Sequence, residues 1–257
     1  MKTLLLEEMT WTQIEEAIEG GMTTVIVCAA SIEQHGPHLP EITDTVIGYH
    51  QAIDLAERLG DALVAPVIRP GLSPHHMSFP GSLTLRPEVF AGIVEDHISG
   101  YIGHGFKTIV LCSSHGGNFA AMTQIAEREN AKHSDVLIVS AMELSDLDAR
   151  LAAGEVELSL PRGSCGGHAC CFETSLMLGF TPELVSMDQA RPGYVGAITG
   201  DIQKEFFEQG VASVSESGVM GDPTMASAEI GKKLFAQMMD LQERIVREKL
   251  NRPAREK

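Results

Sequence analysis

The sequence predicts an α/β protein with three layers, in which helices cover both faces of a mostly parallel central sheet. Four short apolar runs rich in β-branched residues are typical of strands buried on both faces of such a sheet. Helical patterns lie between these runs, and this alternation indicates βαβ units with right-handed crossovers. The 257 residues show no break in composition. We therefore expect one domain over residues 1–257.

The expected strands are residues 23–30 (TTVIVCAA), 62–67 (ALVAPV), 108–112 (TIVLC) and 136–139 (VLIV). After the first strand, Val46, Tyr49, Ile53 and Ala56 recur at helical spacing, which predicts a helix that ends near Gly60. Further helices are expected over residues 89–101 and 119–132, where Asn118 would cap the second.

The second half is less regular. Residues 146–167 are polar and glycine-rich, which predicts a long loop that serves either as an active-site lid or as a subunit contact. A buried helix is expected to start at residues 171–178, and residues 191–200 form another glycine-rich stretch. A charged amphipathic helix is expected from residue 226 to about residue 250.

Charge and cysteine usage restrict the partners of the protein. The chain has 19 Lys and Arg against 35 Asp and Glu, a formal net charge of -16. Such a surface repels phosphate backbones and anionic lipids, so no nucleic-acid or membrane partner is expected. No CxxC pair occurs among the five cysteines, and Cys28 and Cys112 lie in apolar runs that predict burial. This pattern favours a reduced, cytoplasmic protein.

The loop after the first expected strand, SIEQHGPHLPEITDT, holds an unusual density of ionisable side chains. Glu33 and His35 are two residues apart, so in an extended segment they point to the same side and can bind one divalent metal ion. Asp44 is either an ordinary helix N-cap or a carboxylate that bridges two metals. Of the others, His38 would lie behind the ligands or in the pocket, and Glu41 would be a solvated acid.

A second polar loop, SSHGGN, follows the strand at residues 108–112. Ligands in open α/β sheets bind at the carboxyl ends of the strands, so His115 should lie on the same rim as the first loop. His115 is then either a metal ligand or a structural histidine. Neighbouring Ser114, Gly116 and Gly117 are candidates for the substrate pocket.

The third cluster is GHACCFETS, where His168 and Glu173 are candidates for proton transfer and metal binding. Alternatively, Cys165, Cys170 and His168 would form a thiolate site, or Cys170 and His168 would form a nucleophile pair. In the loop SPHHMSFPGS, His75 and His76 either line a pocket, with His76 the better candidate, or are exposed.

Taken in order, SIEQHGPHLP with Asp44, HHMSFPGS, SSHGGN, GHACCFETS and GVMGDPTMAS resemble the creatininase (creatinine amidohydrolase) family, over about residues 25–231. The resemblance implies an α/β/α metal hydrolase that acts on small amides and often forms hexamers. By motif, the two divalent metal ions (Zn, Mn or Fe) would bind Glu33, His35, Asp44, His115 and Glu173, with Asp44 bridging. His168 would be the catalytic histidine that donates a proton to the leaving nitrogen, while a hydroxide between the metals attacks.

Two departures set this chain apart from creatininase proper. That enzyme has an acid two residues after the metal-binding histidine, where this chain has Gly117, and it uses tryptophans around its substrate, where the only tryptophan here is the distant Trp11. The leading hypothesis is therefore a creatininase-like amidohydrolase for a small cyclic amide or formamide, as a homo-oligomer. The alternatives are a peptidase trimming a small modified peptide, which an open groove would favour, and a non-catalytic metal- or ligand-binding protein.

Overall fold

A computed structural model describes residues 3–196 and 199–253. The described chain contains a parallel sheet of strands β1 (Thr24–Ala29), β2 (Ala62–Val64), β3 (Thr108–Ser113) and β4 (Leu137–Ser140), in the order β2-β1-β3-β4. All neighbouring pairs are parallel, and Cys28 on β1 lies opposite Cys112 on β3. The four strands occur where the apolar runs predict them, with β2 three residues shorter.

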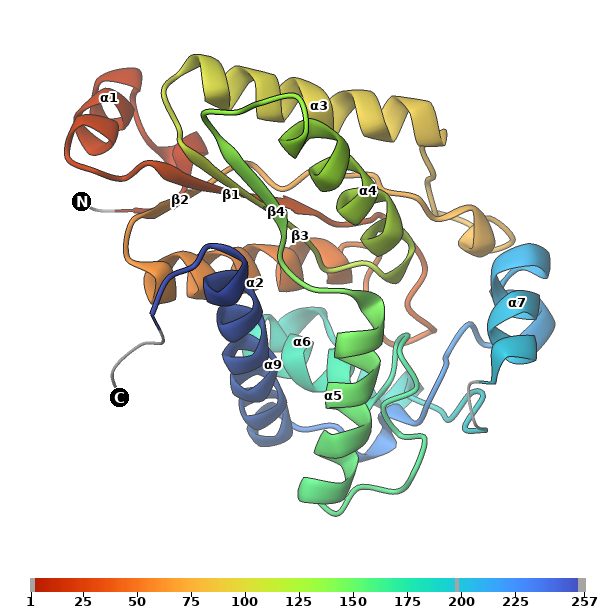
Figure 1. Ribbon diagram of the computed structural model, residues 1–257. Coiled ribbons are helices and arrows are strands. Elements are labelled where there is room, and N and C mark those ends of the chain that lie inside the picture. Colours follow the sequence, from red (N-terminus) through yellow and green to blue (C-terminus); the bar gives the residue numbers. More distant parts are fainter. Residues whose placement is uncertain (1–2, 197–198, 254–257) are drawn as a thin grey trace.

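The sheet is covered on both faces, as predicted (Figure 1). Because side chains alternate along a strand, Val25, Val27 and Ala29 of β1 face one core, and Ile26 and Cys28 face the other. Helices α1 (Trp11–Glu19), α3 (Pro87–Gly103) and α4 (Phe119–Asn130) pack on the first side. Helices α2 (Thr43–Leu59), α5 (Leu144–Glu157), α6 (Cys171–Phe180) and α9 (Ala228–Lys249) build the second.

Helix α2 is present and ends near Gly60 as predicted, but of the four predicted positions only Ala56 is fully buried. Val46, Tyr49 and Ile53 are only half-buried, whereas Ile47 and Leu55 point into the core. The N-cap is Ile42, and the helix starts at Thr43, so the interpretation of Asp44 as an N-cap is wrong. The carboxylate of Asp44, which is buried in the first turn of the helix, is therefore available for a role other than capping.

The prediction of a loop over residues 146–167 is wrong for its first half, which belongs to α5. A capping box joins Glu143 and Asp146 at its start. Gly154 is needed for close packing, since a Cβ there would lie 2.5 Å from Cδ2 of Leu234 on α9. Most polar residues of the helix are exposed or half-buried and gave this segment its loop-like composition, whereas Glu155 is buried.

Short elements complete the chain. Helices α1, α7 (Gly200–Gln209) and α8 (Val211–Val214) were not predicted, whereas α3, α4, α6 and α9 occur where they are expected. The 3-10 turns are η1 (Leu6–Glu8), η2 (Pro74–His76), η3 (Gly116–Asn118), η4 (Pro182–Leu184), η5 (Met187–Gln189) and η6 (Pro223–Met225). Across the described ranges, none of the helices has both the length and the apolar character to cross a membrane.

Candidate metal centre

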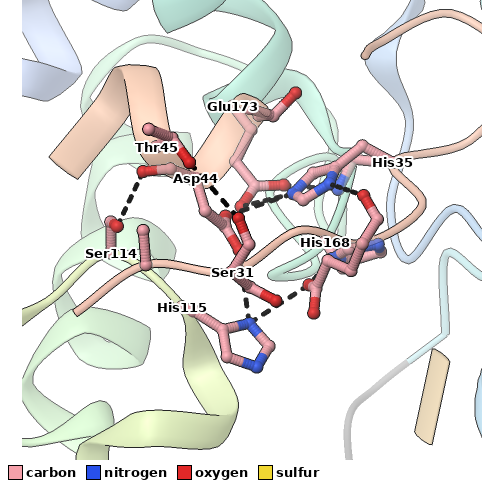
Figure 2. A network of polar contacts seen from close by, with 12 residues as sticks. Ser31, His35, Asp44, Thr45, Ser114, His115, His168 and Glu173 are labelled. Carbon is pink, nitrogen blue, oxygen red and sulfur yellow. Dashed lines mark hydrogen bonds and ion pairs between the residues drawn. The ribbon is translucent and has the colours of Figure 1, made fainter. Parts of the chain in front are cut away.

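Two loops at the carboxyl ends of strands and the first turns of two helices bring the candidate ligands together. The loop between β1 and α2 carries Glu33 and His35, the turn after β3 carries His115, and the first turn of α6 carries Glu173. All four side chains, and Asp44 in the first turn of α2, are buried. Figure 2 shows the imidazoles of His35 and His115 on two sides of the Asp44 carboxylate. The rim position predicted from topology is therefore correct.

One nitrogen of His35 is held by the backbone, and the other faces carboxylates. Its Nδ1 lies 3.0 Å from the carbonyl oxygen of Glu33, which can only accept, so Nδ1 carries a proton. Its Nε2 lies 3.2 Å from Oδ1 of Asp44 and 3.8 Å from Oε1 of Glu173. Only Nε2 is thus available to bind either a proton or a metal ion.

His115 has the same arrangement with its nitrogens exchanged. Its Nε2 lies 2.9 Å from the carbonyl oxygen of Leu72 and donates to it. Its Nδ1 lies 3.1 Å from Oε1 of Glu33 and 3.4 Å from Oδ2 of Asp44. Asp44 therefore has one carboxylate oxygen beside each imidazole, which is the arrangement that a bridging ligand requires.

The buried carboxylates of the cluster favour positive charge on the side chains and ions beside them. Burial alone would lower the pKa of His35 and His115, yet the neighbouring carboxylates raise both pKa values well above 6.5. Within the described residues, Oε1 and Oε2 of Glu33, Nε2 of His35 and Oδ2 of Asp44 are buried without a hydrogen bond. Buried charged groups need such partners, so these side chains fit divalent cations as their missing partners.

The geometry offers more than one ligand set. Ligand atoms of Glu33, His35 and Asp44 lie within 4.8 Å of one another, as do those of His35, His168 and Glu173. A third group of this kind combines Glu33, His76 and His168. The three groups share Glu33, His35 and His168, so they are overlapping ways in which these side chains could hold an ion.

His168 and Glu173 both lie beside His35. Glu173 accepts a short hydrogen bond from the backbone of Ala169 at Oε2, which directs Oε1 toward His35. Nε2 of His168 lies 2.7 Å from the carbonyl oxygen of Gln34, and its Nδ1 lies 3.6 Å from Oε1 of Glu33. Burial, together with nearby His35, lowers the pKa of His168 well below 6.5, so the ring is neutral.

A cavity of about 700 Å³ opens over this cluster. On the centre side it is lined by Glu33, His75, His76, His115, Gly116, Gly117 and His168. Opposite walls come from α5, the loop after it and α7, including Phe206 and Phe207. Arg162, Gly167 and Phe207 on its edge are exposed, so the cavity is open to solvent.

The pocket predictions are met in part. His76, Gly116 and Gly117 line the cavity, but Ser114 does not, and its hydroxyl instead donates to the carbonyl oxygen of Asp44 at 2.7 Å. His75 is buried, which rules out an exposed loop residue, and its ring centroid lies about 5 Å from those of Phe206 (5.0 Å) and Phe207 (4.9 Å).

Three other expectations are resolved by hydrogen bonds and burial. Asn118 occupies the N-cap position of α4 as expected, but its side chain makes no capping hydrogen bond and instead bonds the backbone of Leu72 and Ala30. Nε2 of His38 lies 2.9 Å from Oγ1 of Thr174, behind Glu173. Oε2 of Glu41 is buried, and burial raises the pKa of this side chain, so it is not a freely solvated acid.

A thiolate site is disfavoured. Cys170 is fully buried, and burial raises the pKa of its thiol to about 12. The pKa of Cys165 is raised as well, by a hydrogen bond with Cys171 and by burial. At neutral pH these groups are thiols, which are poor nucleophiles and poor metal ligands.

Sequence reasoning missed Gln34. This residue lies between Glu33 and His35, and its side-chain amide contacts both His76 and His168. The neutral amide of a glutamine does not stand out in a sequence as a metal ligand or a proton carrier. Its position inside the ligand motif was the only available indication.

Comparison with known proteins places the chain in a family. The family model described as "Creatininase: Creatinine amidohydrolase" matches residues 7–246. The chain belongs to the creatininase family. Family membership makes it a hydrolase acting on carbon–nitrogen bonds, as the motifs predict.

Relatives of this creatininase-family protein carry different names. It is 31% identical over 234 residues to the mycofactocin precursor peptide peptidase of Mycolicibacterium smegmatis, covering 89% of this chain and 86% of the relative. It is 29% identical to the creatinine amidohydrolase of Pseudomonas putida, covering 73% and 76%. The solved structure "Creatininase Mn" superposes with a TM-score of 0.79 and 25% identity, covering 96% of this chain and 98% of that one.

In this creatininase-family chain, steric crowding explains why Gly117 stands where creatininase proper has an acidic residue. A Cβ at Gly117 would lie 2.3 Å from the carbonyl oxygen of Leu72 and 2.6 Å from Nε2 of His115. These are the two atoms whose hydrogen bond fixes the His115 ring. An acidic side chain at this position is therefore incompatible with the observed His115 geometry.

Proposed function

We propose that the protein is a two-metal amidase that hydrolyses an amide bond in a short peptide. The carrying observation is the set of buried ligand atoms on Glu33, His35 and Asp44 that make ion-pair contacts with one another or with His115 but no hydrogen bond. One cation would bind Glu33, Asp44 and His115, and the other would bind His35, Asp44 and Glu173, with Asp44 shared. Zn²⁺, Mn²⁺ and Fe²⁺ all suit such a set of imidazoles and carboxylates.

When bound, the metal pair supplies a Lewis acid for the substrate carbonyl and lowers the pKa of the attacking water. The protein holds the pair through Asp44 and fixes the ring orientations of His35 and His115 through their backbone acceptors. The five ligand side chains come from segments that are distant in sequence, namely the β1–α2 loop, α2, the turn after β3 and α6, so the fold must form before the full set exists.

His168 is proposed to move the proton. Its Nε2–H is engaged by the carbonyl oxygen of Gln34, so Nδ1 is the free nitrogen that faces the centre. Because burial keeps the ring neutral, Nδ1 can accept a proton as the water attacks. It can then deliver this proton to the departing nitrogen, since an amide nitrogen leaves poorly unless it is protonated.

The cavity supports a peptide as substrate more than a small ring. A volume of about 700 Å³ lies in the range that holds drug-sized ligands. The cavity opens to solvent, and the segment at residues 146–167 forms one wall of it. The 31% identity to a peptide peptidase points in the same direction. A small cyclic amide or formamide is the second candidate, favoured by the relative named creatinine amidohydrolase.

A substrate panel tests this proposal. The protein, loaded with Mn²⁺ or Zn²⁺, is incubated with short peptides, creatinine, lactams, hydantoins and formamides, and products are identified by mass spectrometry. Peptide cleavage is the expected result. Cleavage of small rings alone would replace the first candidate by the second, and no cleavage by a fully loaded protein would contradict both.

We also propose an oligomeric state and a cellular location for the protein. We expect a homo-oligomer, for which a hexamer is the family's usual form, and light scattering would measure its mass. A cytoplasmic location is expected from the five free cysteines.

A further inference from the structure

The amide of Gln34 lies between the two histidines at the open side of the centre. Its side chain is buried, and its Nε2 lies 2.9 Å from Nδ1 of His76 and 2.9 Å from Nε2 of His168. The same nitrogen lies 3.2 Å from the carbonyl oxygen of Gly218. Oε1 accepts from the backbone N–H of Gly36 at 2.8 Å, and since that group can only donate, the orientation of the amide is fixed.

The two amide protons of Gln34 have two acceptors. Nε2 of His168 lies 2.7 Å from the carbonyl oxygen of Gln34, which has no proton to give, so this nitrogen is itself a donor. It cannot also accept from the amide. The amide protons therefore go to the carbonyl oxygen of Gly218 and to Nδ1 of His76.

The proton of His76 is placed by the same reasoning. Because Nδ1 accepts from Gln34, it carries no proton, and since an imidazole ring keeps at least one proton, the other nitrogen is protonated. That proton is on Nε2, the atom 3.3 Å from Oε1 of Glu33. A metal ion could bind this nitrogen only by displacing the proton, and Nδ1 cannot take the proton up while it accepts from Gln34.

We propose that Gln34 is a positioning residue that keeps His76 out of the metal-ligand set by fixing the proton of His76 on Nε2. By distance alone, Glu33, His76 and His168 would hold an ion. The amide of Gln34 removes His76 from this set and makes it an N–H group that points at Glu33. The consequence for metal binding rests on the proposed function, but the proton position does not.

Gly218 supports this role. Its φ of +77° favours glycine, and a Cβ there would lie 2.1 Å from Oε1 of Gln34. The backbone at Gly218 thus closes against the amide and accepts one of its protons. A packing site that fits only one orientation of the amide would be unnecessary if Gln34 only filled space.

The test is ¹⁵N NMR of histidine-labelled protein, in which long-range correlations between ring protons and nitrogens distinguish the two neutral tautomers. Spectra are recorded without metal and with Zn²⁺, and the signals of His76 are assigned by comparison with His76→Gln. The expected result is that His76 carries its proton on Nε2 in both states. A proton on Nδ1, or a Zn²⁺-dependent shift of Nε2 typical of a ligand, would overturn the proposal.

Two variants extend the test. Gln34→Glu replaces the donor by an acceptor, so the proton of His76 should move to Nδ1 and Nε2 should shift when Zn²⁺ is added. If this variant does not fold, Gln34→Met, which has no donor, should give a mixture of tautomers.

The matched control is Gln51→Glu, at a buried glutamine that donates to the carbonyl oxygen of Ser113, and it should leave the tautomer of His76 unchanged. An unchanged His76 tautomer in the folded Gln34 variants would also overturn the proposal. Because the metal-free spectra need no bound ion, failure of the metal hypothesis would be seen separately.

Discussion

Nε2 of His35 and Oδ1 of Asp44 lie 3.2 Å apart in a site where both side chains are almost completely buried. Among the described residues this nitrogen has no hydrogen-bond partner. The imidazole of His115 faces the other oxygen of the same carboxylate. Asp44 is thus the residue on which both halves of the proposed metal pair depend.

Asp44→Asn should abolish metal binding at both positions. An amide offers one neutral oxygen in place of two charged ones, so it cannot bridge two cations. We expect at least a tenfold loss of bound metal, measured by mass spectrometry of the purified protein. Asp240→Asn, on the exposed face of α9, is the matched control and should retain wild-type metal. Retention of both ions by Asp44→Asn would refute the bridging role.

Metal binding should release protons at pH 7. Carboxylates raise the pKa of His35 and His115 well above 6.5 in the metal-free protein, so both rings hold an extra proton there. A metal ion must displace this proton, so affinity should rise with pH up to the raised pKa values and fall in acid. Calorimetry in buffers of different ionisation enthalpy measures the released protons. Binding without proton release would show that these nitrogens are not the ligands.

His168→Ala should keep its metal and lose most of its turnover. General acid–base catalysis contributes roughly 10²–10⁴-fold to rate, and we expect a fall of kcat in that range. Metal content and kcat are measured on the same sample, so the two roles are separated. Loss of metal in this variant would instead make His168 a ligand.

Gly117→Ala should destabilise the protein, whereas Gly116→Ala should not. A Cβ at Gly117 meets the Leu72 carbonyl at 2.3 Å, but nothing lies within 4 Å of one at Gly116. Overpacking typically costs about 1–3 kcal/mol, which is the expected fall in the free energy of unfolding. Metal affinity should fall as well, because the Leu72 carbonyl holds His115. Equal stability of the two variants in denaturant titration would count against this packing argument.

Much of the fold could be predicted because its signals are local. The strands of a parallel sheet are continuous apolar runs, and their carboxyl ends follow from chain direction alone. Helix α5 was missed because a helix with one buried stripe and a glycine against α9 has a loop-like composition. Helix α7 was missed for a related reason, since it follows a glycine-rich stretch.

The candidate ligands were predictable because their side chains are chemically distinctive and lie on one rim. The role of Ser114 was predicted incorrectly, since the direction of a side chain in a loop depends on contacts distant in sequence. Gln34 was missed because its part in the site depends on the proton positions of two distant histidines. Such relationships exist only in the folded molecule.

The most direct measurement of the central claim is a metal titration of hydrolysis. Protein purified without chelator is stripped, reloaded stepwise with Mn²⁺ or Zn²⁺, and assayed with the best substrate of the panel. We predict two bound ions per chain, with hydrolysis requiring the second equivalent. Substantial hydrolysis by stripped protein, or no binding and no gain in rate when metal is added, would contradict a two-metal hydrolase.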